Sequence, residues 1–242
     1  MNIIRFDTID STSSYLKREW EHLEDSSVVT SHHQTAGKGR LGRTWEDDSG
    51  SVVFSVLLKE NLDEERIHLL PLLCGTCLYE VLRRYGISSS IKWPNDVLID
   101  GKKCAGILLE SVFEKKLEAL VVGIGVNVNS LSFDGDLKKK ATSLFLSTGR
   151  KFDQDRFLLD YLDCFFSSYR KYQNGDDGFL DVLKKHSYLD GKMVLLDYYG
   201  ENRNCLVLGI NDDGSLKVKE KDKVYSVFSG EATLHSNYHP LG

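Results

Sequence analysis

The sequence predicts an α+β protein in which a larger mixed unit is followed by a small all-β unit. Strand-like and helical segments are interspersed as far as Asp190. Five short strand-like runs then follow, separated by turn residues such as Asn211–Gly214, which is typical of a small β-barrel or sandwich. With 242 residues, 41% of them hydrophobic, the chain suffices for one large domain or two smaller ones with a packed core.

Composition and charge exclude several classes of protein. The chain has 31 Lys and Arg against 36 Asp and Glu, and a net charge of −5 is unfavourable for a protein that coats nucleic acid or an anionic membrane. No apolar run approaches the roughly 18 residues of a membrane-spanning helix. The first residues, MNIIRFDTID, lack the basic and apolar regions of a secretory signal.

The five cysteines indicate a cytoplasmic protein, because their odd number and wide scatter do not resemble a disulfide framework. Cys74 and Cys77 have the spacing of a redox or metal pair, but a zinc site would need a second close pair. The segment around them also has the pattern of a buried helix, in which cysteine packs as a small hydrophobic residue. We favour the buried helix.

The strands of the larger unit follow from apolar runs bounded by turn residues. We expect them at Ile3–Phe6, Ser27–Ser31, Ser51–Leu58, Ile91–Trp93 and Val97–Ile99, then from the Asp100-Gly101 hairpin turn to about Leu109, and at Leu117–Val128. The last run is nearly continuous in apolar residues, so we place it at the centre of a sheet.

Capping residues and helical spacing predict the helices. Asp10–Thr12 supply the start of the first helix. The acidic residues Asp63–Glu65 suit the start of a second helix that continues to Tyr85, with Pro71 in its first turn or at a kink. Two further helices are expected at about Gln154–Gln173 and Gly178–His186.

The strand-like runs after residue 190 form the predicted small unit. They are Lys192–Asp197, Asn204–Ile210, Ser215–Lys219, Val224–Phe228 and Ala232–Leu234. About 50 residues are marginal for an independent core, so we expect this unit to dock on the larger one. The alternating lysines between Lys217 and Lys223 are interpreted as one solvated face of a hairpin.

Two long irregular stretches, His32–Gly50 and Asn129–Lys140, interrupt the larger unit, and such stretches in a compact domain are either functional or disordered. The first contains the loop GKGRLGR, Gly37–Arg43, whose glycines let the backbone wrap a ligand and whose basic side chains favour an anion. It has neither the Walker spacing nor the helix of a dinucleotide fingerprint. The residues alone leave two interpretations open, an anion-binding loop or an ordinary solvated basic loop.

Two further motifs are candidates for a ligand site. KWPND, Lys92–Asp96, precedes a hairpin that should bring Asp96 and Lys103 to one end of a sheet, either as ligand contacts or as an ordinary surface ion pair. GIGVNVN, Gly123–Asn129, places glycines inside a central strand. Such glycines mark either a ligand lying on the sheet or a β-bulge.

Taken in order, these motifs resemble the signature of biotin protein ligases, the biotin–[acetyl-CoA-carboxylase] ligases. The motifs are Ser11-Thr12, the GKGRLGR loop followed by Trp45, KWPND, Lys103 with Ala105-Gly106-Ile107, and GIGVNVN. The resemblance covers about Ile9 to Arg150, and the run SGEATL at 229–234 is similar to part of the family's SH3-like domain. KWPND combined with the glycine–arginine loop is highly specific.

The resemblance implies a mixed β-sheet catalytic domain with helices packed on one face, the class II synthetase-like fold of biotin and lipoate ligases, at residues 1–188. An SH3-like β-barrel would follow at residues 189–242. It also implies that biotin, ATP and Mg²⁺ yield biotinyl-5′-AMP and pyrophosphate. The biotin would then pass to a lysine of a biotin carboxyl carrier protein. No nucleic acid or membrane partner is expected, and a homodimer is left open.

The family pattern assigns residues to both substrates. For biotin they are Ser11, Thr12, Ser13, Gln34, Gly37, Lys38, Gly39, Arg40, Lys103, Gly106, Leu108 and Gly123. For ATP or the adenylate they are Arg40, Arg43, Trp45, Asn95, Lys103, Asn127 and Asn129. Arg40 and Lys103 would offset the repulsion between a carboxylate and a triphosphate. Asp96, the third catalytic candidate, would act as a base, orient Lys103 or contact metal.

The sequence departs from the family pattern in three respects. Ser13 replaces the usual asparagine, and because a hydroxyl is shorter than an amide, its direct contact with biotin is left open. Lys38 replaces an arginine, which removes a bidentate side-chain contact. There is no room before Ile3 for the helix-turn-helix of the bifunctional members, so we expect a monofunctional ligase. A lipoate ligase and a non-catalytic biotin sensor are the alternatives.

Overall fold

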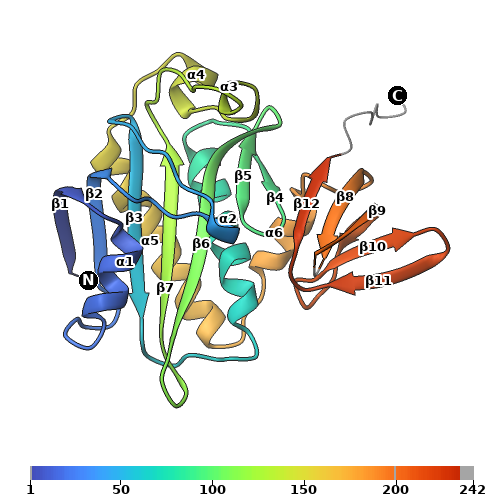
Figure 1. Ribbon diagram of the computed structural model, residues 1–242, viewed down its shortest axis with the longest axis horizontal. Coiled ribbons are helices and arrows are strands. Elements are labelled where there is room, and N and C mark those ends of the chain that lie inside the picture. The colour runs from blue at the N-terminus through green and yellow to red at the C-terminus, as the bar shows by residue number, and fades with distance from the viewer. Residues whose placement is uncertain (1, 199, 235–242) are drawn as a thin grey trace.

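The computed structural model describes residues 2–198 and 200–234 (Figure 1). Its larger unit is built on a seven-stranded mixed sheet, ordered β1-β2-β3-β7-β6-β5-β4. The strands are β1 (Ile3–Ile9), β2 (Val28–Gln34), β3 (Ser51–Leu58), β4 (Ser90–Lys92), β5 (Asp96–Ile99), β6 (Lys102–Phe113) and β7 (Leu117–Asn127). The β1–β2 pair is parallel and the other neighbours are antiparallel. The apolar β7 lies at the centre, which confirms the prediction.

Helices cover both faces of this sheet. The described helices are α1 (Thr12–Glu19), α2 (Leu70–Arg84), α3 (Leu137–Lys140), α4 (Leu144–Thr148), α5 (Gln154–Gln173) and α6 (Phe179–Lys185), and α3 and α4 lie at one end of the sheet (Figure 1). The predicted packing on one face holds for α2 and α5, which share the main core with Val56 and Leu58 of β3. Helix α1 packs on the opposite face, where its Leu16 meets Leu57 of β3 and Val121 of β7. Side chains alternate along β3, and the strand therefore serves both cores.

Helix α2 corrects one expectation. It begins at Leu70, after a short 3₁₀ segment at Ile67–Leu69, and not at Asp63. Asp63 instead forms a turn of its own, in which its side chain accepts from Glu65 N–H at 3.1 Å and its carbonyl accepts from Arg66 N–H at 3.1 Å. Pro71 sits in the first turn of α2, where its missing N–H costs nothing. The predicted stop is confirmed by Gly86, which has φ +75°.

The C-terminal unit is a five-stranded antiparallel sheet, ordered β11-β10-β9-β8-β12. Its strands are β8 (Met193–Tyr198), β9 (Glu201–Ile210), β10 (Leu216–Glu220), β11 (Lys223–Val227) and β12 (Glu231–Leu234). These match the five predicted runs within three residues. The division of the chain at 188/189 stays a prediction.

The C-terminal sheet docks through the turn at Asp212–Gly214, next to α2 and α6 (Figure 1). Lys184 Nζ lies 2.5 Å from Asp212 Oδ1, and His68 Nε2 lies 3.0 Å from the Asp213 carbonyl oxygen. Trp93 Nε1 donates to the Gly214 carbonyl at 3.2 Å. This is the docking that the small size of the unit predicts. In the described part of the chain, no helix is long and apolar enough to cross a membrane.

Candidate active site

The glycine–arginine loop is folded back on itself in front of the sheet. Trp45 N–H donates to the Gly37 carbonyl at 3.0 Å, and Gly39 N–H donates to the Arg43 carbonyl at 2.7 Å. A Cβ at Gly37 would lie 2.4 Å from the Trp45 carbonyl oxygen, so only glycine fits there. Leu41 at the tip is 70% exposed with φ +55°, a left-handed conformation that costs a branched residue energy. The tip therefore buries little apolar surface.

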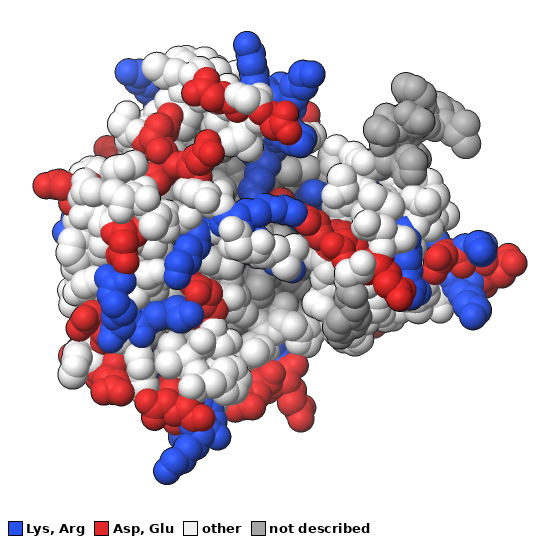
Figure 2. Space-filling model, viewed as in Figure 1, with Lys and Arg blue, Asp and Glu red and all other residues white. Residues whose placement is uncertain are grey.

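The two arginines of this loop have different partners. Arg40 donates to Asn95 Oδ1 at 3.0 Å and to the Gly230 carbonyl at 3.3 Å, and its burial lowers its pKa. Arg43 forms a bidentate ion pair with Glu231 at the start of β12, which raises the pKa of Arg43 and lowers that of Glu231. Basic and acidic side chains meet at this junction of the two sheets (Figure 2). Both arginines therefore reach the C-terminal unit, but only Arg40 also lines the cavity described below, whereas Arg43 is occupied by Glu231.

The KWPND segment brings its acid to a lysine of β6. Asp96 opens β5 and lies 2.7 Å from Lys103 Nζ, as the predicted hairpin requires. Lys103 Nζ also lies 5.6 Å from the centre of the Trp45 ring. Asn95 Nδ2 donates to the Ile107 carbonyl at 2.9 Å, which leaves its Oδ1 for Arg40. Lys92 is largely buried, and this burial lowers its pKa.

Glycines leave a bare surface in the middle of the sheet. Gly106 of β6 pairs with Gly125 of β7, and Leu108 pairs with Gly123, without a register shift at these positions. The alternative of a β-bulge is therefore wrong. A Cβ at Gly125 would lie 2.3 Å from the Trp45 ring, and one at Gly123 would lie 2.6 Å from Ser13 Oγ. The missing side chains make room for Trp45 and Ser13 on the sheet.

A polar cluster closes the other end of this surface. Gln34 Oε1 accepts from Thr12 N–H at 2.9 Å and from Thr12 Oγ1 at 3.1 Å. Ser55 of β3 lies between Thr12 and Ser13, with Oγ–Oγ distances of 2.8 and 3.0 Å. Gln34 N–H is held in turn by Asp47 Oδ2 at 3.1 Å, and the Asp47 side chain is only 1% exposed. The cluster is buried and its hydroxyls are bonded to one another.

Together these segments enclose one cavity of about 450 Å³, a figure that includes its solvent-filled mouth. The predicted residues that line it are Ser11, Thr12, Ser13, Gln34, Lys38, Gly39, Arg40, Trp45, Asn95, Lys103, Gly106, Leu108 and Gly123. Val53, Phe54, Ile107, Ile124 and Gly125 complete its wall. The cavity therefore has a neutral polar end, an apolar wall and a cationic end.

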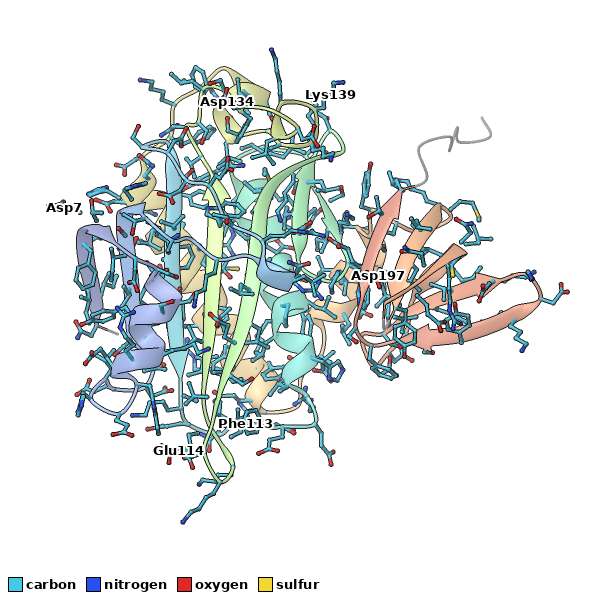
Figure 3. All side chains as sticks on the ribbon, viewed as in Figure 1. Asp7, Phe113, Glu114, Asp134, Lys139 and Asp197 are labelled. Atoms are coloured by element: carbon cyan, nitrogen blue, oxygen red, sulfur yellow. The ribbon has the colours of Figure 1, made fainter. Side chains whose placement is uncertain are left out.

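Several predicted residues do not line the cavity. Gly37 shapes the loop behind it, and Arg43 turns to Glu231. Asn127 is buried and donates to the Thr142 carbonyl at 3.1 Å, while Asn129 donates to the Phe152 carbonyl at 2.8 Å. These two asparagines hold the backbone beyond β7, where α3 and the labelled Asp134 and Lys139 lie (Figure 3).

Sequence reasoning missed Ser55. It interrupts the apolar run SVVFSVLL and is completely buried. A polar residue inside a buried strand needs a hydrogen-bond partner, and this was the available signal.

The arrangement does not fit a resident metal site. Among the described residues, no three His, Cys, Asp or Glu side chains are grouped to hold an ion. Asp96 has its carboxylate paired with Lys103. All five cysteines are free and buried, and Cys74 and Cys77 lie inside α2, which confirms the buried-helix interpretation.

Comparisons with known proteins agree on one family. The model of the biotin/lipoate A/B protein ligase family matches residues 5–127. The bifunctional ligase/repressor BirA of Bacillus subtilis is 32% identical over 223 residues, which are 87% of this chain and 66% of that protein. The biotin–[acetyl-CoA-carboxylase] ligase of Paracoccus denitrificans is 34% identical over 159 residues, 62% of this chain and 65% of that protein. The chain thus spans slightly less than two thirds of these curated relatives.

The fold is also shared with solved structures. The biotin protein ligase of Aquifex aeolicus in complex with biotin and ATP superposes with a TM-score of 0.87 at 30% identity, over 97% of this chain and 98% of that chain. The similarity includes the C-terminal sheet as well as the larger unit, because nearly the whole of both chains is covered.

Proposed function

This chain belongs to the biotin/lipoate A/B protein ligase family, and from that premise we propose that it activates biotin with ATP and transfers it to a carrier protein. In the first step a biotin carboxylate oxygen attacks the α-phosphorus of ATP, which releases pyrophosphate and leaves biotinyl-5′-AMP. In the second step a lysine amine of a biotin carboxyl carrier domain attacks the acyl carbon. AMP leaves and the amine loses a proton.

The cavity is the single observation that carries this proposal. Its closed end presents Thr12, Ser13 and Gln34, which suit the neutral polar ring of biotin. Its open end presents Arg40 and Lys103, which suit a carboxylate meeting a triphosphate. A site with both ends is what an acid–ATP ligase needs, whereas a biotin sensor needs only the first.

We assign roles to the three catalytic candidates on the same geometry. Lys103 and Arg40 would stabilise the negative charge that develops when the carboxylate attacks the α-phosphate. The Asp96 carboxylate would orient Lys103, since the two groups are 2.7 Å apart. This ion pair favours orientation over the roles of base and metal ligand. Trp45 and Asn95 are proposed on the nucleotide side, because they border the cavity next to these cations.

The second step requires a neutral lysine amine on the carrier domain. At a reference pKa near 10.4, only about 0.04% of a lysine amine is neutral at pH 7. We propose that the acyl–phosphate mixed anhydride provides the driving force and that the site provides proximity. Magnesium would enter with the triphosphate as part of the ATP substrate, since the residues do not form a metal site.

The setting of the enzyme follows from the same premise. The carrier domain of a biotin-dependent carboxylase is the proposed partner. The free cysteines fit the cytoplasm, where thiols stay reduced. A homodimer would form at the edge of the seven-stranded sheet that β1 provides, since the β4 edge is covered by backbone hydrogen bonds between Ile91 and residues 186–188.

Exchange of labelled pyrophosphate into ATP tests the first step. We expect exchange that depends on biotin and is not supported by lipoate. Exchange with lipoate and not with biotin would identify a lipoate ligase. Tight biotin binding without exchange would identify a sensor.

A further inference from the structure

Four polar side chains at the closed end of the cavity form one continuous hydrogen-bonded chain. Gln34 Oε1 accepts both the backbone N–H and the hydroxyl of Thr12. Ser55 Oγ lies 2.8 Å from Thr12 Oγ1 and 3.0 Å from Ser13 Oγ. Thr12, Ser13 and Gln34 line the cavity, whereas Ser55 is completely buried behind them.

The two contacts of Ser55 have no direction of their own, and their directions are assigned from the bonds to Gln34. The Gln34 atom that accepts from Thr12 N–H must be the oxygen, because an amide NH₂ group cannot accept. Thr12 uses its one hydroxyl proton on this oxygen, so it accepts from Ser55. Ser55 has then used its own proton and accepts from Ser13. Ser13 therefore has no proton left and offers only lone pairs to a ligand.

The neighbouring backbone leaves this geometry little freedom. Ser55 of β3 faces Gly123 of β7, and a Cβ at Gly123 would lie 2.6 Å from Ser13 Oγ and 3.5 Å from Ser55 Oγ. Ser13 thus occupies the space that the glycine leaves open. Ser13 is 5% exposed and Gln34 is 9% exposed, so water competes weakly for these groups.

We propose, building on the proposed function, that Ser55 is a positioning residue that fixes Ser13 as a hydrogen-bond acceptor and thereby selects a cyclic urea. The ring of such a ligand offers N–H to Ser13 and a carbonyl to a donor, and Gln34 Nε2 is the donor left free by the chain. A dithiolane ring, as in lipoate, has no N–H to give. A site built around such a bond rejects analogues that lack the donor.

The test uses a probe that changes one hydrogen-bond donor into an acceptor. Biotin is compared with its cyclic carbamate analogues, in which one or the other ring N–H is replaced by oxygen. The readout is the KM and kcat of pyrophosphate exchange. In the unmodified protein, at least one isomer should have a KM about 100-fold above that of biotin, because its ring oxygen faces the lone pairs of Ser13.

Removal of the Ser55 hydroxyl should weaken the preference for biotin over the carbamate isomer. In Ser55→Ala, the Ser13 hydroxyl is free to turn its proton toward the ring oxygen. The preference for biotin over that isomer, measured as the ratio of their kcat/KM values, should fall about tenfold or more. Ser55→Thr keeps a hydroxyl and should restore the preference. Ser13→Ala removes the acceptor itself and should lower the preference without touching Ser55.

Thr30→Val is the matched control, since it removes a buried hydroxyl from β2 that donates to the Val53 carbonyl at 2.8 Å outside the cluster. It should keep the full preference. An unchanged preference in folded Ser55→Ala overturns the proposal. If Ser55→Ala does not fold, an unchanged preference in Ser13→Ala overturns it. Absence of biotin-dependent exchange in the unmodified protein refutes the proposed function itself, and the inference with it.

Discussion

Lys103 is the residue on which the proposed chemistry depends most. Its ammonium group lies between the Asp96 carboxylate and the Trp45 ring, at the cationic end of the cavity. Such a position suits the charge that develops when two anions react. The local geometry agrees with the sequence prediction, which placed Asp96 and Lys103 together because a strand, a tight turn and a hairpin must return the chain to the same sheet end.

Lys103→Ala should abolish most adenylation. Loss of one preorganised charge of this kind lowers kcat about 10²- to 10³-fold. Pyrophosphate exchange measures the loss, and circular dichroism shows that the fold is kept. Lys102→Ala is the matched control, because Lys102 is the exposed neighbour on the same strand. Near-normal exchange in Lys103→Ala would remove this residue from the reaction.

Arg40→Gly should loosen the retention of biotinyl-5′-AMP. The guanidinium contact is charge-assisted, and its loss costs about 1.5–3 kcal/mol. The observable is increased labelling of bystander proteins in a mixture that contains no carrier domain. Arg40→Gln separates loss of charge from gain of loop flexibility and should label bystanders nearly as much. Retention equal to that of the unmodified protein would place Arg40 outside the site.

Between elements, the most consequential contact joins the glycine–arginine loop to the C-terminal sheet. Arg43 and Glu231 are 188 residues apart and form the bidentate pair at the start of β12, while Arg40 reaches the Gly230 carbonyl. The sequence contained both partners and could not pair them, because nothing local relates a loop to a strand of another unit. The C-terminal sheet therefore contacts the glycine–arginine loop as well as α2.

Glu231→Gln should weaken this contact with little effect on stability. The Arg43 side chain is 60% exposed, so the pair contributes at most about 1 kcal/mol to the free energy of unfolding. We expect a severalfold rise in the KM for ATP and faster proteolytic cleavage within Gly37–Arg43. Glu201→Gln, which breaks the Arg203 pair elsewhere in the same sheet, is the control. Identical behaviour of the two variants would mean that the contact does not position the loop.

The predictability of single elements follows their length and periodicity. The bounds of β3 and α5 agree with prediction to the residue, because an uninterrupted apolar run and five turns of helical spacing leave one interpretation. The start of α2 was misplaced because Asp63 forms its own turn. Helix α4 was not predicted, since its five residues are too few for a periodic pattern.

For the molecule as a whole, the turn at Gly214 is the anchor that holds the two sheets together. Gly214 has φ +77°, and a Cβ there would lie 2.4 Å from Leu69 Cδ2 and 2.9 Å from Leu72 Cδ1, both of which belong to buried core side chains. Trp93 of the KWPND segment donates to the carbonyl of the same glycine. The candidate active site and the docking of the small sheet thus share one segment.

Gly214→Ala should lower the free energy of unfolding more than a comparable change elsewhere. Strain from positive φ costs about 1–2 kcal/mol, and overpacking against the two leucines adds about 1–3 kcal/mol. Urea denaturation measures the total loss in the free energy of unfolding. Gly175→Ala isolates the strain, because Gly175 has φ +80° with nothing within 4 Å of its Cβ position. Equal losses in the two variants would show that Gly214 is not an anchor.

The sequence accounted for most of the cavity and for few of its internal contacts. Motifs predicted which segments converge, because glycines, basic residues and strand ends have local signatures. The chain through Ser55, the ion pair of Arg43 and the structural roles of Asn127 and Asn129 depend on neighbours far apart in sequence. Such contacts become visible only when the strands are in register.

The most direct test of the account is transfer of biotin to a purified apo carrier domain. The 242-residue chain is incubated with ATP, magnesium and the carrier domain, with either biotin or lipoate, and the carrier is analysed by mass spectrometry. We predict a mass increase of one biotinyl group on a single lysine, which requires ATP and is lost in Lys103→Ala. A carrier that remains unmodified with biotin, or that gains a lipoyl group instead, would contradict the central claim.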